Sequence, residues 1–183
     1  MALAHAILVS LMDFPCTGYE LGKRFDGSVG FVWKASHQQI YHELAKLEFQ
    51  GWVSSETIPQ EGRPDKKLYQ VTELGKNQLI KWLKTPCEPT HTKDELLLKF
   101  RAGYLVPSQA ILEELERHRK AHQQKLSVYQ NLEQLYTQNS QELSQEAKFR
   151  YLTVRRGIHY ETAWLTWYDE VIRVIGDVKT NPE

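Results

Sequence analysis

The sequence has few cysteines, no long apolar run and no excess of charge of either sign. Its two cysteines, Cys16 and Cys87, are too few for a disulfide framework, and we expect both to be reduced thiols. No stretch approaches the roughly 20 consecutive apolar residues that span a bilayer. The start, Met-Ala-Leu-Ala-His, also lacks the basic segment of a secretory signal. We therefore expect a cytoplasmic chain with no membrane partner.

The charges cancel, with 23 Lys and Arg against 23 Asp and Glu, so overall charge gives no reason to expect nucleic-acid binding. Any such binding requires a local site. The chain is 183 residues long, which is enough for one full domain or two small ones. Hydrophobic residues at 41% and charged residues at 25% are typical of globular proteins and argue against disorder.

The sequence changes character near its middle. Residues 1–84 hold most of the glycines and all of the strand-like segments, whereas residues 93–183 consist almost entirely of helix-forming residues. Between them, residues 85–92 contain two prolines and no apolar periodicity, which is typical of a connector. We expect a first domain over 1–84, a connector over 85–92 and a helical second domain over 93–183.

Apolar spacing and turn residues give the first domain a definite order of elements. The expected elements are a helix over 2–13, a helix over 17–25, a helix between Ser36 and Gly51, strands over 53–58 and 67–71, and a helix from Thr72 in which Leu79, Trp82 and Leu83 face inward. This order is that of a winged helix-turn-helix. The predicted fold class is mainly α with a small β-hairpin.

The helix after Ser36 has two different sides. Ser36 stands three residues before Gln39, which is the spacing of a capping box. Ile40, Leu44 and Leu47 form an aliphatic ridge, and Gln38, Tyr41, His42 and Ala45 lie on the other side. A helix that enters the DNA major groove needs such a polar outer side and an apolar inner one. Beside it, the hairpin tip carries Arg63, Lys66 and Lys67, which suit contact with phosphates.

The second half contains two long apolar helices. Residues 107–138 carry one narrow apolar seam at steps of three and four, which indicates a coiled-coil-like contact. Residues 146–175 carry two apolar stripes about 130° apart at 100° per residue, a wider arc than one neighbouring helix covers. A closed two-fold homodimer would cover the remainder. The candidate dimer-interface residues are Leu115, Leu126, Tyr129, Tyr160, Trp164, Trp167 and Val171.

Several motifs resemble those of the PadR transcriptional regulators, and within that family the likeness is closest to a virulence activator. The motifs are Trp33-Lys-Ala-Ser-His-Gln-Gln-Ile-Tyr-His-Glu-Leu44, Pro59-Gln-Glu-Gly62, Lys67-Leu-Tyr69 with Thr72 and Gly75, Leu152-Thr-Val-Arg-Arg156, and Ala163-Trp164 with Trp167 and Asp169-Glu-Val171. The resemblance implies an N-terminal winged helix, a C-terminal dimerisation domain, promoter binding as a homodimer and, in many members, a small-molecule effector.

Double-stranded DNA is therefore the expected partner, bound at a pseudo-palindromic site by two modules related by two-fold symmetry. The candidate DNA-binding residues, drawn from the polar helix side, the hairpin tip and the resemblance, are Lys34, Ser36, His37, Gln38, Gln39, Tyr41, His42, Arg63, Lys66, Lys67 and Tyr69.

Two side-chain pairs in the second half have more than one interpretation. His118 and His122, four residues apart, could share a metal ion, form a pH-sensitive interface or simply pack; no third ligand stands at a suitable spacing, so no metal site is predicted. Trp164 and Trp167 could line an effector pocket across a dimer, although such pairs more often form interface core.

Motifs typical of enzymes are missing from the sequence. It has no nucleophile elbow, phosphate-binding glycine loop, zinc-ligand spacing or dinucleotide fingerprint, so no catalysis and no cofactor are expected. The alternative to a DNA-binding regulator is a helical interaction module whose winged helix binds another protein.

Overall fold

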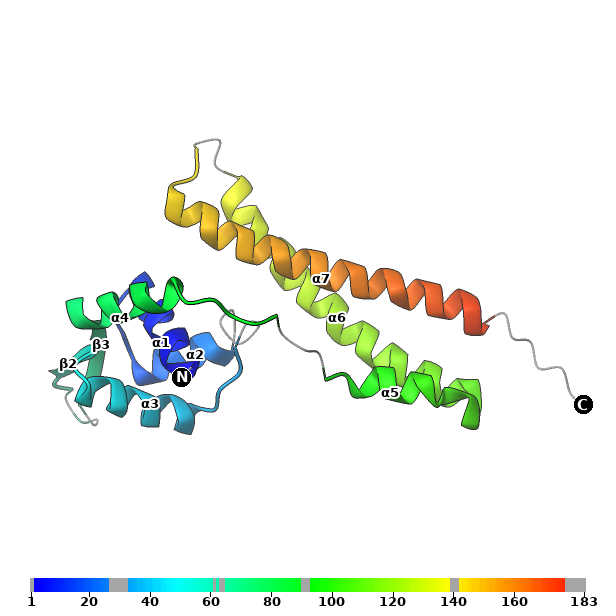
Figure 1. Ribbon diagram of the computed structural model, residues 1–183, viewed down its shortest axis with the longest axis horizontal. Coiled ribbons are helices and arrows are strands. Elements are labelled where there is room, and N and C mark those ends of the chain that lie inside the picture. The colour runs from blue at the N-terminus through cyan, green and yellow to red at the C-terminus, as the bar shows by residue number, and fades with distance from the viewer. Residues whose placement is uncertain are drawn as a thin grey trace, which may run out of the picture. The chain divides into compact units, whose positions relative to one another are not determined.

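The computed structural model describes residues 2–26, 33–60, 62, 65–89, 93–138 and 142–176 (Figure 1). The chain divides into two compact units, Met1–Thr90 and His91–Glu183, and the boundary lies inside the segment 85–92. Among the described residues, no helix combines the length and apolar character that crossing a membrane requires.

The first unit contains helices packed on a small antiparallel sheet (Figure 1). Its elements are α1 (Ala2–Asp13), β1 (Cys16–Thr17), α2 (Gly18–Asp26), α3 (His37–Phe49), β2 (Val53–Ile58), β3 (Lys66–Val71) and α4 (Glu73–Leu83). The sheet order is β1-β3-β2, with Tyr69 opposite both Cys16 and Ser55. The predicted fold class, mainly α with a β-hairpin in a winged helix-turn-helix, is confirmed.

The core of the first unit is aliphatic and closes around the inner side of α3. Its fully buried members are Ile7, Leu8, Leu21, Ile40, Leu44 and Leu47, with Val53 at 2% exposure. Leu79 of α4 is buried as expected, but Trp82 and Leu83 are 41% and 65% exposed, so their predicted inward orientation is wrong. The ring of Trp82 instead stacks on His5 of α1, with ring centroids 4.4 Å apart.

Side-chain caps fix where two helices of this unit begin. The Ser36 side chain accepts a hydrogen bond from the Gln39 N–H, and the Gln39 side chain accepts one from the Ser36 N–H, which completes the predicted capping box. Thr72 caps α4 by accepting from the Gly75 N–H at 3.0 Å. Because a hydrogen-bonded cap sets the helix start, the side chains of α3 take fixed directions from its first turn.

The second unit is built from two long helices that run side by side in opposite directions (Figure 1). It comprises α5 (Glu95–Arg101), the 3₁₀ turn η2 (Gly103–Leu105), α6 (Ser108–Thr137) and α7 (Gln145–Gly176). Leu96, Leu115 and Val171 form its buried core, which continues into partly buried aromatic residues. Gly157 of α7 allows the close approach, because a β-carbon there would stand 2.4 Å from the ring of Tyr129 on α6.

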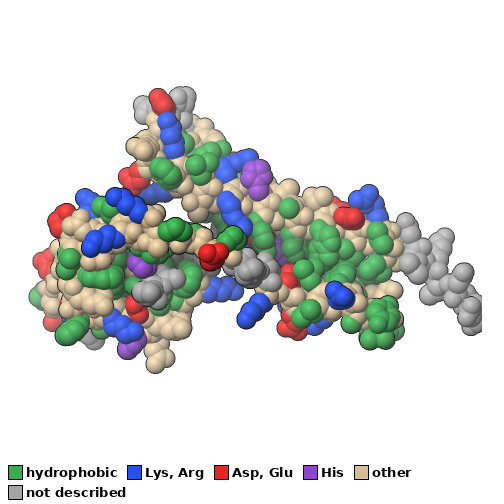
Figure 2. Space-filling model, viewed as in Figure 1, with side chains coloured by type: hydrophobic (Ala, Val, Ile, Leu, Met, Phe, Trp, Pro, Cys, Tyr) green, Lys and Arg blue, Asp and Glu red, His purple; other side chains and the backbone are tan. Residues whose placement is uncertain are grey.

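Many apolar side chains of the second unit are exposed among its described residues (Figure 2). They include side chains from α5 and η2, such as Leu98 at 69% and Leu105 at 70%, and Val174 near the end of α7 at 67%. Large contiguous apolar surface of this kind marks an interaction site more often than a solvated face.

Candidate nucleic-acid interface

The outer side of α3 presents polar groups to solvent. Gln38, Tyr41 and His42 are exposed, with Tyr41 at 48%, whereas the aliphatic ridge opposite them is fully buried. The structure therefore gives this helix the two sides expected from its sequence. Such a helix can place amide, hydroxyl and imidazole groups at base edges without losing its own packing.

Other candidate residues at the start of α3 already have partners within the protein. The side chains of Ser36 and Gln39 form the capping box, and His37 Nε2 lies 3.0 Å from the carboxylate of Asp26. Lys34 is exposed just before the helix. Base contacts from Ser36, His37 or Gln39 would have to compete with these bonds. Lys34 has no such bond to give up among the described residues.

Two glycines of α2 let α3 approach it closely. A β-carbon at Gly18 would lie 2.5 Å from the Tyr41 ring, and one at Gly22 would lie 2.5 Å from the His37 ring. The two glycines are four residues apart on α2, and the two ring residues are four residues apart on α3. Each ring of α3 therefore rests on one glycine of α2. Sequence reasoning missed this arrangement, although the Gly-x-x-x-Gly spacing inside a helix was a signal that could have indicated close packing.

The hairpin carries cations, but they differ in their surroundings. Lys66 and Lys67 are exposed at the start of β3, while Arg63 lies outside the described residues. The Lys67 Nζ lies 3.5 Å from a carboxylate oxygen of Glu48 on α3. The other oxygen of Glu48 accepts a hydrogen bond from the Ser55 hydroxyl of β2. One carboxylate therefore links α3 to both strands of the hairpin, and nothing in the sequence pattern singled it out.

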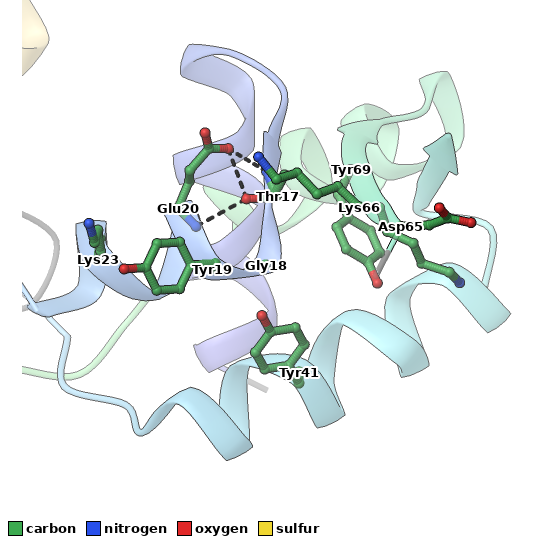
Figure 3. A pocket seen from close by; sticks show the side chains of 10 residues that line it. Thr17, Gly18, Tyr19, Glu20, Lys23, Tyr41, Asp65, Lys66 and Tyr69 are labelled. Carbon is green, nitrogen blue, oxygen red and sulfur yellow. Dashed lines mark hydrogen bonds between the residues drawn. The ribbon is translucent and has the colours of Figure 1, made fainter. Parts of the chain in front are cut away.

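A cavity of about 740 Å³ lies between α2, α3 and the start of β3 (Figure 3). It is lined by Thr17, Gly18, Tyr19, Glu20, Lys23, Tyr41, Asp65, Lys66, Lys67 and Tyr69. Tyr69 is only 7% exposed, so its ring belongs to the core rather than to an open surface. The cavity therefore joins four residues of the candidate DNA-binding set to the first turn of α2, namely Tyr41, Lys66, Lys67 and Tyr69.

Burial and hydrogen bonding around this cavity shift two pKa values in opposite directions. Burial raises the pKa of Tyr69 above its usual range, with the nearby Lys67 acting against this shift. Hydrogen bonds from the Thr17 N–H at 2.8 Å and the Thr17 hydroxyl at 2.9 Å lower the pKa of Glu20. At neutral pH the cavity thus holds a neutral phenol and a carboxylate that is already bonded to Thr17.

The candidate dimer residues have clear roles within one chain. Leu115 is fully buried and Val171 is 7% exposed, so both are core residues of the second unit before any partner binds. The seam residues Leu126 and Tyr129 are half-buried. Tyr160, at 46%, is the most exposed of the seven. The exposed apolar residues of α5 and η2 were not among the candidates, because residues 93–107 show no periodicity long enough to separate a short helix from its neighbours.

His118 and His122 have different partners within the second unit. The His122 Nδ1 hydrogen-bonds to Glu161, and its ring stacks on Trp164 with centroids 3.9 Å apart. Trp164 and Trp167 meet edge to face at 5.7 Å, which fills the space between them. No group of three His, Cys, Asp or Glu side chains that could hold a metal ion occurs in the part of the chain that the structure describes.

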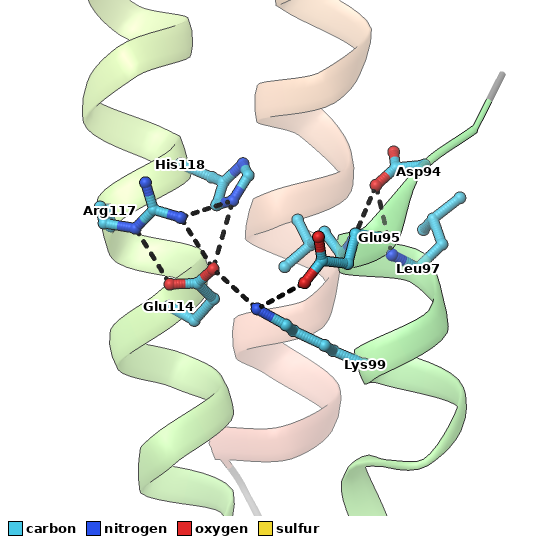
Figure 4. A network of polar contacts seen from close by, with 8 residues as sticks. Asp94, Glu95, Leu97, Lys99, Glu114, Arg117 and His118 are labelled. Atoms are coloured by element: carbon cyan, nitrogen blue, oxygen red, sulfur yellow. Dashed lines mark hydrogen bonds and ion pairs between the residues drawn. The ribbon is translucent and has the colours of Figure 1, made fainter.

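His118 instead lies beside a polar network that joins α5 to α6 (Figure 4). Glu114 is its centre, with Arg117 at 2.8 Å and Lys99 at 3.5 Å. The hydrogen bond from Arg117, reinforced by Lys99, lowers the pKa of Glu114 to about 2. Asp94 caps α5 by accepting from the Leu96 N–H at 3.0 Å. These contacts fix α5, and with it the apolar surface, on α6.

Comparison with known proteins agrees with this architecture over both units. The model of the PadR-like family of transcriptional regulators matches residues 7–81, and the model of the virulence activator alpha C-terminal family matches residues 92–176. A probable transcriptional regulator of Mycobacterium tuberculosis is 36% identical over 186 residues, covering 96% of this chain and 98% of the relative.

Solved structures resemble the chain along nearly its whole length. PadR of Bacillus subtilis in complex with operator DNA has a TM-score of 0.82 at 27% identity and covers 96% of this chain and 99% of its own. The same protein in complex with p-coumaric acid has a TM-score of 0.76 at 26% identity, and the match covers 97% of this chain and 100% of that structure's chain.

The virulence activator AphA of Vibrio cholerae has a TM-score of 0.74 at 30% identity, covering 97% of this chain and 99% of its own. AphA is thus one structural neighbour among several. The mycobacterial and Bacillus proteins resemble this chain as much as AphA does, or more. The expectation that the likeness to the virulence activator is the closest is not supported.

Proposed function

Since this chain belongs to the PadR-like family of transcriptional regulators rather than to a family of enzymes, we propose that it binds double-stranded DNA with α3 in the major groove and the β2–β3 hairpin against the sugar–phosphate backbone. The observation that carries this proposal is the polar side of α3, where Gln38, Tyr41 and His42 are exposed on a helix whose inner ridge is fully buried. The likeness to a PadR structure that holds operator DNA supports it.

The roles of the candidate residues follow from their surroundings. Gln38 and His42 are exposed and suited to base edges, because amide and imidazole groups form directional hydrogen bonds there. Lys34 and Lys66 are exposed cations that suit phosphates. Ser36 and Gln39 act mainly by fixing the start of the helix. The domain limits in this proposal stay at 1–84, 85–92 and 93–183.

The chain acts as a homodimer in this proposal, held together by the second unit. The exposed apolar side chains of α5, η2 and the end of α7 support it, because a two-fold axis would cover the same surface on both protomers. Two winged helices related by that axis would read a pseudo-palindromic site with half-sites about one helical turn, or a multiple of it, apart. As a regulator of chromosomal genes the dimer works in the cytoplasm.

A small-molecule effector is a second part of the proposal, supported by the p-coumaric acid in a related PadR structure. The proposed place for a flat ligand is against the partly buried rings of Phe100, Trp164 and Trp167, where an aromatic ligand could stack on their outer faces. Titration with p-coumaric acid as the probe, followed by tryptophan fluorescence, tests this part. A saturable change supports it, and an unchanged spectrum at millimolar probe argues against it.

Selection of bound duplexes from random DNA, using the full chain, tests the main function. We expect enrichment of a two-fold symmetric motif. The logarithm of the affinity for this motif should fall linearly with the logarithm of the salt concentration. If no duplex is enriched and the chain passes through a DNA column at low salt, the winged helix binds another protein instead. Reporter genes carrying the selected site then establish whether binding represses or activates transcription.

A further inference from the structure

Tyr69 combines a buried ring with a free hydroxyl group. The side chain sits in the middle strand of the sheet and is 7% exposed. Within residues 2–26, 33–60, 62 and 65–89, no group forms a hydrogen bond to its hydroxyl, and the hydroxyl is not sealed off from solvent. Figure 3 shows this hydroxyl turned toward the space beside Tyr41 of α3. A buried phenol whose donor faces a cavity is available for a ligand, since buried polar groups are normally paired.

The other groups around the cavity favour an anion. Lys23, Lys66 and Lys67 bring three positive charges against two negative ones from Glu20 and Asp65. The Glu20 carboxylate is bonded to the N–H and hydroxyl of Thr17, and the charge of Lys67 is countered by Glu48. Lys66 is the cation of β3 that has no ion pair within 4 Å among the described residues, and its charge acts at longer range on Glu20, whose pKa it helps to lower.

We infer that this cavity seats one phosphate group of the DNA backbone in each protomer, with the Tyr69 hydroxyl donating to a phosphate oxygen and Lys66 supplying the positive charge. The inference rests on the proposed function, because only a helix bound in the major groove brings a DNA strand alongside Tyr41. A neutral donor gives this contact a property that lysine contacts lack, because it adds affinity without adding to the salt dependence. It positions the duplex relative to α3 and carries no base preference.

Tyr69→Phe tests the hydroxyl alone, because it keeps the ring in the core. With the full chain and a selected duplex, we expect about tenfold weaker binding per half-site, the scale of a hydrogen bond to a charged acceptor. The slope of log affinity against log salt stays unchanged. Lys66→Ala weakens binding and makes that slope shallower by about one per half-site. Ser127→Ala removes an exposed hydroxyl of α6 outside both proposed interfaces; it is the control and leaves both quantities unchanged.

Replacing single backbone phosphates by neutral methylphosphonates identifies the bound group. The unmodified chain should lose affinity at each contacted phosphate, and Tyr69→Phe should reduce the loss at one of these positions in each half-site and leave the others unchanged. Thermal unfolding of the variant without DNA serves as the check on folding. If Tyr69→Phe binds every duplex as tightly as the unmodified chain, the inference is overturned while the proposed function stands.

Two further outcomes also decide the question. If the methylphosphonate penalties are the same in both proteins, Tyr69 does not contact a phosphate, whatever its effect on affinity. If inorganic phosphate at millimolar concentration binds the free chain in a Tyr69-dependent way but the duplex penalties do not change, the cavity takes a free anion and the DNA assignment is wrong. Failure of the unmodified chain to bind any duplex would instead reject the proposed function together with this inference.

Discussion

The ring of Tyr41 lies against the backbone of Gly18, so closely that a β-carbon at position 18 would stand 2.5 Å from it. This contact fixes both the distance between α2 and α3 and the direction of an aromatic ring on the proposed DNA-binding side. Glycine at position 18 is therefore a condition for the shape of the interface. The same relation holds for Gly22 and His37.

Gly18→Ala should displace the Tyr41 ring and weaken DNA binding by about tenfold, a loss on the scale of one good polar contact. The helix itself tolerates alanine, which is the better helix former by roughly 1 kcal/mol. The measurement is a binding titration in the native background and in Tyr41→Ala. In the latter the added methyl group meets no ring, so a further loss of the same size there would contradict this explanation.

Gln38→Ala should relax base preference and leave the salt slope nearly unchanged. The amide is exposed on α3, and a good base contact discriminates by about 1–3 kcal/mol. Titrations on the selected and a scrambled duplex at several salt concentrations measure both quantities. A variant that keeps its full preference but has a shallower salt slope would show that Gln38 does not read bases.

Glu48→Gln should increase the affinity for all duplexes and make the salt slope steeper by up to one per half-site. Glutamine can still accept from Ser55, but it no longer neutralises Lys67, whose Nζ lies 3.5 Å from the present carboxylate. In a Lys67→Ala background the same change should have no effect on the slope. If Glu48→Gln changes the salt slope equally in both backgrounds, release of the Lys67 charge is not the cause of the change.

Much of the first unit could be predicted because its signals are local. Ser36 and Gln39 set the start of α3, and Ile40, Leu44 and Leu47 identified its buried side without any knowledge of its neighbours. The strands flanking Gly62 followed in the same way from their alternation. The two-residue strand Cys16–Thr17 could not be predicted, since two residues carry no periodicity.

What was missed depends on contacts between segments distant in sequence. The ring of Trp82 stacks on His5 of α1, a residue 77 positions earlier in the chain, and is still 41% exposed. Glu48 joins Ser55 and Lys67 only after the hairpin folds back on α3. The free hydroxyl of Tyr69 is visible only once the sheet has buried its ring.

Leu98→Glu combined with Leu105→Glu should convert the protein to a folded monomer. The two leucine side chains are 69% and 70% exposed in the single chain, so the introduced glutamates do not enter its core. Light scattering gives the mass, circular dichroism checks the fold, and Gln124→Glu on α6 is the control. A dimer that survives the double substitution would move the interface elsewhere, and a monomeric unmodified chain would exclude the homodimer.

Glu114 should contribute to stability above pH 4.5 and lose this contribution as the pH falls toward 2. Its pKa is lowered from 4.5 to about 2 by the hydrogen bond from Arg117 and by Lys99, so the folded state holds the charged form more strongly than the unfolded chain does. The difference in Tm between the unmodified protein and Glu114→Gln should therefore be largest near neutral pH and vanish near pH 2. Glu113→Gln is the control, and a difference that grows on acidification would contradict the sign.

Competition between the selected duplex and a scrambled one of the same length, measured across a salt series with the full chain and with Gln38→Ala, tests the central claim most directly. If α3 reads bases, the full chain prefers the selected duplex at every salt concentration. Gln38→Ala should then lose roughly 1–3 kcal/mol of that preference per half-site with an unaltered slope. Equal binding of both duplexes by the full chain, or a preference that Gln38→Ala leaves unchanged, would show that α3 is not the reading element.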